Sequence, residues 1–204
     1  MCSLILIRHG ETDWNRVGRI QGLTDIPLND AGREQARRAA EELRSELAIS
    51  PSDAADAAVI VSSDLQRAAE TADIIAGALG LDAPRRYPEL RERAYGDAEG
   101  LLTAEFQRRW GPWHVADVPG AETRADLRRR ALAALARAQH DAAPMGTTLP
   151  LIVVAHGALI REVIGHATDD RLPEPGVRLP NGSLHRFEVE TGRLRLVLPV
   201  EITR

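Results

Sequence analysis

The sequence contains very little cysteine and few aromatic residues. Its single cysteine, Cys2, can neither form a disulfide within the chain nor build a cysteine-rich metal site. Phe, Trp and Tyr together make up 3% of the 204 residues, so we expect a core built mainly from Ala, Leu, Val and Ile.

Long hydrophobic runs are also absent. The apolar runs, such as residues 4–7, are far shorter than the ~20 residues that a membrane-spanning helix needs. The N-terminus lacks the basic segment and the extended apolar segment of a secretory signal. We therefore expect a cytoplasmic protein with no membrane partner.

The chain has no large excess of charge of either sign. Its 26 basic and 30 acidic residues leave a net charge of −4, which does not favour a nucleic-acid partner. A chain of 204 residues can bury a sizeable core, and we predict a single domain over residues 1–204. The sequence leaves the oligomeric state open, with a homodimer among the alternatives.

Apolar runs alternate with amphipathic stretches along the chain. Residues 4–7 and 57–61 have the composition of buried strands, and an amphipathic helix is predicted between them, after Asp30. The S-x-x-Q pattern that begins at Ser63 resembles a capping box and predicts a helix from there to Gly80. Further strands are predicted at 84–87, 151–155, 183–189 and 194–202, and further helices at 101–110, after Thr123 and after 156.

This alternation predicts an α/β fold. We expect a three-layer sandwich, with a largely parallel central sheet and helices on both faces. The last two predicted strands are separated by a short polar segment and are expected to form an antiparallel hairpin that closes the sheet.

Two of the predicted strands are followed by the same dipeptide. The strand at 4–7 runs into Arg8, His9 and a glycine, and the strand at 151–155 runs into His156 and a glycine. Because the carboxyl ends of parallel strands meet at one edge of the sheet, where ligands of open α/β sheets bind, we expect the two histidines to lie close together. A lone histidine after a strand is more often structural, but the repeat favours a functional site.

A further basic group is expected at the same edge. Arg67 lies near the start of a predicted helix, and guanidinium groups and helix N-termini both bind phosphate oxygens well. Together with Arg8 and the two histidines it predicts a pocket for a compact oxyanion, of which phosphate is the simplest. A histidine there can act as a nucleophile if a carboxyl group protonates the leaving oxygen.

Other basic residues and histidines are weaker candidates. The run from Arg128 to Arg130 lies within a predicted helix, and we favour a solvated helix face over phosphate contact. The histidines without a comparable setting are predicted to be structural or surface residues, and they are His114, His140, His166 and His185.

Several short motifs resemble those of one enzyme family. The stretch from Leu6 to Thr12, with Asn15, resembles the signature of the histidine phosphatase superfamily, also called the phosphoglycerate mutase-like family. Each further motif is weak alone, but together they are highly specific and cover nearly the whole chain. They are 18–22, 28–36, 62–68, 90–92, 99–100, 155–157 and 181–183.

The resemblance implies catalytic and phosphate-binding roles. His9 is the residue that would be phosphorylated, and Glu92 would be the general acid and base, with Glu99 or Glu11 as alternatives. The residues that would hold the phosphoryl group are Arg8, Asn15, Arg67 and His156.

It also implies a small phosphorylated substrate, with no metal and no cofactor. The implied substrate-binding residues are Gln21, Gly22, Arg93, Tyr95 and Gly157.

The resemblance leaves hydrolysis and phosphoryl transfer to be distinguished. The loop from Glu92 to Gly96 is similar to a mutase loop, but Ala94 replaces its histidine, and residues 112–119 leave no room for the long basic insertion of mutases. Because a short loop admits water, we favour a phosphomonoesterase acting on sugar or sugar-acid phosphates. A cofactor-dependent phosphoglycerate mutase and a non-catalytic phosphate-binding regulatory protein remain the alternatives.

Two departures from the phosphatase pattern affect the predicted pocket wall. Ala98 stands where the phosphatase branch usually has tryptophan, and Ala121 replaces a usual glycine. We therefore expect an altered substrate preference.

Overall fold

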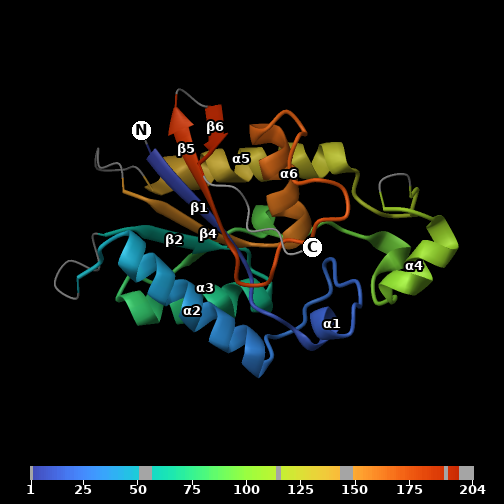
Figure 1. Cartoon of the computed structure of the whole chain (residues 1–204), viewed down its shortest axis with the longest axis horizontal. Helices are drawn as coiled ribbons and strands as arrows, with labels where there is room; N and C mark the ends of the chain where they lie inside the picture. The colour runs from blue at the N-terminus through green and yellow to red at the C-terminus, as the bar shows by residue number, and fades with distance from the viewer. Residues whose placement is uncertain (1, 51–56, 114–115, 143–148, 191–192, 198–204) are drawn as a thin grey trace.

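A six-stranded mixed sheet forms the centre of the protein (Figure 1). The computed structural model describes residues 2–50, 57–113, 116–142, 149–190 and 193–197. The strands are β1 (Cys2–Arg8), β2 (Val59–Ser62), β3 (Arg85–Arg86), β4 (Leu151–Ala155), β5 (Leu184–Glu190) and β6 (Arg193–Leu196). Their order is β3-β2-β4-β1-β5-β6; the first four are parallel, whereas β5 and β6 are antiparallel additions.

Helices cover both faces of this sheet. They are α1 (Asp13–Arg16), α2 (Asp30–Glu46), α3 (Gln66–Leu79), α4 (Thr103–Trp110), α5 (Arg124–Ala142) and α6 (Gly157–Ala167), with short 3₁₀ helices η2 (Pro88–Leu90) and η3 (Gly96–Ala98). Figure 1 shows α2 and α3 on one side of the sheet and α5 and α6 on the other. None of the helices in the described ranges is long and apolar enough to cross a membrane.

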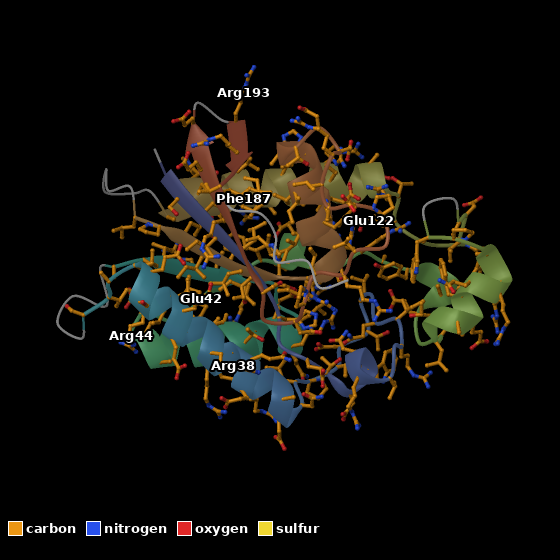
Figure 2. All side chains as sticks on the ribbon, viewed as in Figure 1. Arg38, Glu42, Arg44, Glu122, Phe187 and Arg193 are labelled. Atoms are coloured by element: carbon orange, nitrogen blue, oxygen red, sulfur yellow. The ribbon has the colours of Figure 1, made fainter. Side chains whose placement is uncertain are left out.

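The alternation of side chains along β1 explains the three layers. Leu4 and Leu6 pack in the core beneath α5 and α6, whereas Ile5 and Ile7 pack in the core beneath α2 and α3, and all four are fully buried. The outer face of α2 carries charged residues such as Glu42 (Figure 2). The predicted α/β three-layer sandwich is therefore confirmed.

A small separate core lies beyond the edge of the sandwich. Ile20, Ala98, Phe106 and Val118 form this cluster, and α4 packs there, away from the sheet (Figure 1). These residues come from two loops, the 3₁₀ helix η3 and the helix α4, so the cluster packs together the segments that surround the carboxyl ends of the strands.

Several element boundaries differ from those predicted. The helix predicted from Ser63 begins at Gln66, because the Ser63 hydroxyl accepts the backbone N–H of Leu65 at 3.2 Å and forms a turn instead of a helix cap. Its predicted end is confirmed by Gly80, which adopts a left-handed conformation. The hairpin is confirmed, but β6 is shorter than the predicted 194–202, of which residues 198–202 lie outside the described part.

Candidate active site

The two histidines that follow the apolar strands lie side by side. β1 and β4 are neighbours, with Arg8 opposite Ala155, and the backbone N–H of His9 donates to the Ala155 carbonyl at 3.0 Å. The His9 and His156 ring centroids are 5.1 Å apart, and both residues are almost completely buried. The parallel pairing of β1 with β4 thus brings together residues that are far apart in sequence.

A backbone contact orients the His9 ring. Nδ1 lies 2.7 Å from the carbonyl oxygen of Gly10, which can only accept, so Nδ1 carries the proton and Nε2 keeps its lone pair. Burial and the positive charges of Arg67 and Arg8 hold the pKa of His9 well below the usual histidine value. His9 is therefore a neutral imidazole with Nε2 available for reaction at neutral pH.

Two arginines flank the histidines, of which Arg67 is fully buried and Arg8 is half-buried. The terminal nitrogens of Arg67 donate to the carbonyls of Thr24 and Gly22 at 2.9 and 2.8 Å, and one terminal nitrogen of Arg8 donates to the Leu179 carbonyl. In the described part of the chain, Nε of both arginines and both ring nitrogens of His156 have no hydrogen-bond partner. Such buried donors suit an anionic ligand.

Amide side chains hold the loop after β1. The Asn15 amide oxygen accepts from the Asn181 amide at 3.2 Å, and the Asn181 amide also donates to the His9 carbonyl at 3.0 Å. The Thr12 hydroxyl caps α1 and donates to the Gln21 amide oxygen at 3.0 Å. These contacts place Asn15 and Gln21 beside the histidines.

The carboxylate of Glu92 lies at the N-terminus of α6. Its oxygens accept the backbone N–H groups of Ala158, at 3.1 and 3.2 Å, and of Leu159, at 3.2 Å. A carboxylate there satisfies amides that the first turn of a helix leaves free. A side chain of the protein itself therefore occupies the first amides of α6.

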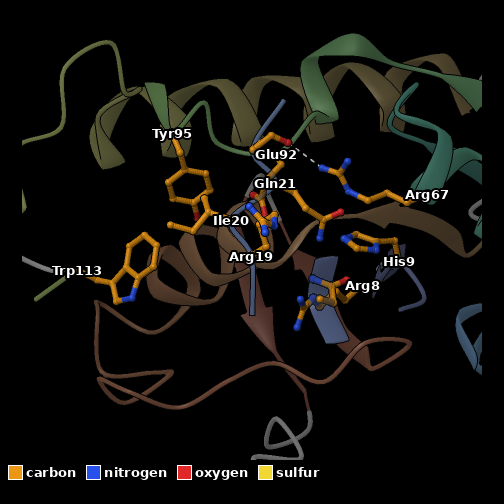
Figure 3. Close-up of a pocket in the computed structure, with 11 residues that line it drawn as sticks. Arg8, His9, Arg19, Ile20, Gln21, Arg67, Glu92, Tyr95 and Trp113 are labelled. Atoms are coloured by element: carbon orange, nitrogen blue, oxygen red, sulfur yellow. Dashed lines mark hydrogen bonds between the residues drawn. The ribbon is translucent and has the colours of Figure 1, made fainter. Parts of the chain in front are cut away.

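A cavity of about 160 Å³ opens between these groups (Figure 3). Figure 3 shows His9, Arg8 and Arg67 at one end, Tyr95 and Trp113 at the other, and Glu92 with Gln21 between them. The complete lining is Arg8, His9, Asn15, Arg19, Ile20, Gln21, Gly22, Arg67, Glu92, Tyr95 and Trp113. A cation-rich end, a neutral imidazole and an acid together can bind a phosphoryl group and exchange protons beside it.

The sequence matches one family along almost its entire length. The family is described as the histidine phosphatase superfamily (branch 1), and the match covers residues 4–201. The chain belongs to the histidine phosphatase superfamily.

Similar proteins carry both phosphatase and mutase names. The chain is 34% identical to "Uncharacterized phosphatase PhoE" of Bacillus subtilis, over 96% of this chain and 93% of that protein, and 34% identical to a "Probable phosphoglycerate mutase GpmB" of Photorhabdus laumondii, over 93% and 86%. A solved structure of mycobacterial glucosyl-3-phosphoglycerate phosphatase with VO3 matches at 30% identity and a TM-score of 0.77, covering 97% of this chain and 98% of that one. This histidine phosphatase is an enzyme of the histidine-type phosphatase class.

The predicted substrate-binding residues occupy different places in this histidine phosphatase. Gln21, Gly22 and Tyr95 line the cavity with the histidines. Arg93 instead lines a neighbouring cavity of about 200 Å³, which shares only Trp113 with the first. Gly157 leaves room for Arg8, because a Cβ there would lie 3.3 Å from the arginine Nε.

The two alternative acids are not among the residues that line the cavity, and each makes structural hydrogen bonds. The Glu99 carboxylate accepts the backbone N–H groups of Leu23, Thr24 and Tyr95. The Glu11 carboxylate accepts from the Asn29 side chain at 2.9 Å. Of the three predicted acids, Glu92 alone is among the lining residues.

Three lining residues were missed by the sequence analysis. Arg19 and Ile20 lie within the motif 18–22, whose order was noted without a role for either residue. Trp113 follows α4 in the chain and lines the cavity while stacking on Phe106, with ring centroids 3.8 Å apart. Only the scarcity of tryptophan, three in the chain, singled it out.

Proposed function

We propose that this histidine phosphatase is a phosphomonoesterase that hydrolyses small phosphorylated metabolites, such as sugar or sugar-acid phosphates, through a phosphohistidine at His9. The observation that carries the proposal is the fixed tautomer of His9: Nδ1 is held by the Gly10 carbonyl at 2.7 Å, which leaves Nε2 as the nucleophile beside Arg8 and Arg67.

The phosphoryl group binds at the cation-rich end of the cavity. Arg8 and Arg67 neutralise its charge, and Asn15 adds a polar group from the cavity lining. His156 is not among the lining residues, but its ring lies 5.1 Å from the His9 ring and adds an uncharged donor behind it. Because the protein holds these groups in place before the substrate arrives, they need little reorganisation as charge develops.

The reaction proceeds in two displacements. Nε2 of His9 forms a bond to phosphorus as the ester P–O bond breaks, and the carboxyl group of Glu92 gives its proton to the leaving oxygen. A water molecule then attacks the phosphohistidine, the N–P bond breaks, and Glu92 takes a proton from that water. Phosphate and the free alcohol are released, and His9 returns to its neutral form.

The dimensions and loops of the site favour hydrolysis of small esters. A cavity of about 160 Å³ lies below the ~300–1,000 Å³ of pockets for drug-sized ligands. The segment between α4 and α5 runs only from Gly111 to Thr123. Ala94 also lacks the imidazole that the similar mutase loop carries.

A substrate panel tests this proposal against its alternatives. Purified protein is incubated with a broad set of phosphomonoesters, with phosphate release and phosphoglycerate interconversion measured in parallel. We expect phosphate release from small sugar or sugar-acid phosphates. Interconversion without release would favour the mutase, and absence of both would favour a non-catalytic phosphate-binding protein.

A further inference from the structure

Arg130 of α5 makes an unusually complete set of contacts. Its Nε and one terminal nitrogen donate to the two carboxylate oxygens of Glu122, at 2.9 and 2.7 Å. The terminal nitrogens also donate to the backbone carbonyls of Glu89 at 2.8 Å, Arg91 at 2.9 Å and Glu92 at 3.3 Å. The prediction of a solvated arginine face was therefore wrong for this residue, whose side chain is 26% exposed.

These contacts also argue against phosphate binding by Arg130. A guanidinium group has five N–H donors, and the five hydrogen bonds of Arg130 all go to the protein. A phosphate contact would require breaking one of them. We therefore look for the role of Arg130 in the backbone segment that its guanidinium group binds.

Two of the three carbonyls, those of Arg91 and Glu92, belong to the loop that carries the proposed acid, and the third belongs to Glu89 in η2, directly before this loop. This loop leaves η2 at Leu90, which is fully buried, and continues through Glu92 to Tyr95. It has no regular hydrogen-bond ladder of its own beyond its short 3₁₀ helices. Arg130, which belongs to α5, holds this backbone in place, because its planar guanidinium group binds several successive carbonyl oxygens.

Glu122, the carboxylate partner of Arg130, lies in the segment directly before α5 and also contacts the loop that carries Glu92. Its backbone N–H donates to the Ala94 carbonyl at 2.9 Å, and its own carbonyl accepts from Nε of Arg93 at 2.7 Å. The side chain of Glu122 is 17% exposed. The Arg130–Glu122 pair therefore joins the segment before α5 to both sides of Glu92.

The position of the Glu92 carboxyl group depends on this backbone. Its oxygens lie 3.1–3.2 Å from the first amides of α6, a distance that leaves little freedom for the loop to shift. A proton donor must come within about 3 Å of the leaving oxygen. A displacement of about 1 Å can cost on the order of 10²-fold in rate.

We propose that Arg130 is a positioning residue for the general acid: its guanidinium group fixes the backbone at Glu92 so that the carboxyl group faces the cavity. The inference rests on the proposed function, in which Glu92 protonates the leaving oxygen. It assigns a role in catalysis to a residue that does not line the cavity.

The test is Arg130→Lys, which keeps the charge but cannot bind Glu122 bidentately and reach three carbonyls as well. Hydrolysis of p-nitrophenyl phosphate, a good leaving group, is compared with hydrolysis of glycerol phosphate, which needs a proton. We expect kcat/KM for glycerol phosphate to fall at least about tenfold relative to p-nitrophenyl phosphate. This ratio does not depend on the folded fraction, so loss of stability alone leaves it unchanged.

Arg129→Lys is the matched control. Arg129 is 75% exposed and pairs with Asp126, and its ratio should equal that of the parent. Glu122→Gln should lower the ratio in the same direction as Arg130→Lys. An unchanged ratio in Arg130→Lys, with a lowered ratio in Glu92→Gln, would overturn the inference and leave the proposed acid in place. An unchanged ratio in Glu92→Gln would overturn both.

Discussion

His9 and His156 occupy equivalent places after neighbouring strands, yet their hydrogen bonding differs. Nδ1 of His9 is paired with the Gly10 carbonyl, whereas neither ring nitrogen of His156 has a partner within the described residues. A nucleophile must present its lone pair in one direction, and only the His9 ring is oriented in that way before a ligand binds. This difference distinguishes the proposed nucleophile from the proposed phosphate-binding histidine.

We predict that His9→Ala removes the covalent intermediate. Its kcat should fall by at least about 10³-fold, because no other imidazole at the site has a fixed tautomer. Quenched reactions of the parent should contain acid-labile phosphate on His9, detected by mass spectrometry. The exposed His140 supplies the control, since His140→Ala should retain full activity. Unchanged turnover in His9→Ala would exclude the covalent route.

At the scale of secondary-structure elements, the site depends on a close approach between the loop after β1 and the start of α2. A Cβ added to Gly10 would lie 2.3 Å from the Gly32 carbonyl oxygen. The same Gly10 supplies the carbonyl that orients His9 and donates its N–H to the Thr71 hydroxyl of α3 at 3.1 Å. The absence of a side chain at Gly10 therefore allows both α2 and α3 to contact the loop that carries His9.

We predict that Gly10→Ala destabilises the protein and reduces its activity. The clash with backbone should cost about 1–3 kcal/mol in the free energy of unfolding, because neither segment can move without breaking contacts. Urea denaturation measures this cost. Gly77→Ala in α3 is the matched control: its new methyl group meets no atom within 4 Å, and it should stabilise by about 0.5–1 kcal/mol. Equal stability of the two variants would contradict the importance of this contact.

At the scale of the whole molecule, three histidines among the described residues are buried in uncharged form. Burial lowers the pKa of His9, His156 and His185, and for His185 the value is about 4. Below pH ~6.5 the unfolded chain binds protons at these sites that the folded protein does not, so folding becomes less favourable as the pH falls. Above that pH both states are neutral and the effect vanishes.

We predict a loss of stability between pH 6.5 and 4 that depends on these histidines. For His185, a shift from 6.5 to about 4 corresponds to roughly 3 kcal/mol at pH 4. His185→Gln should reduce the difference in unfolding free energy between pH 7 and pH 4 by about that amount, as measured by urea denaturation at each pH. His140→Gln, at an exposed position, should leave the difference unchanged. The same pH dependence in both variants would refute the assignment.

Local patterns in the sequence determined the layers and one end of the site. The apolar runs at 4–7 and 151–155 identified β1 and β4, and parallel pairing then required the residues after them to meet at one edge. The cation-rich end could be predicted for this reason, since Arg8 is the last residue of β1, and His9 and His156 directly follow β1 and β4.

The position of Glu92 in the site was decided only by the tertiary structure. Glu92 lies in an irregular loop among other charged residues, and its contact with the amides of Ala158 and Leu159 joins segments more than sixty positions apart. Arg130 looked like one of three equivalent surface arginines until packing of α5 against that loop brought carbonyl oxygens to its guanidinium group. Helical periodicity shows which side chains share a face, but long-range packing decides which partners they meet.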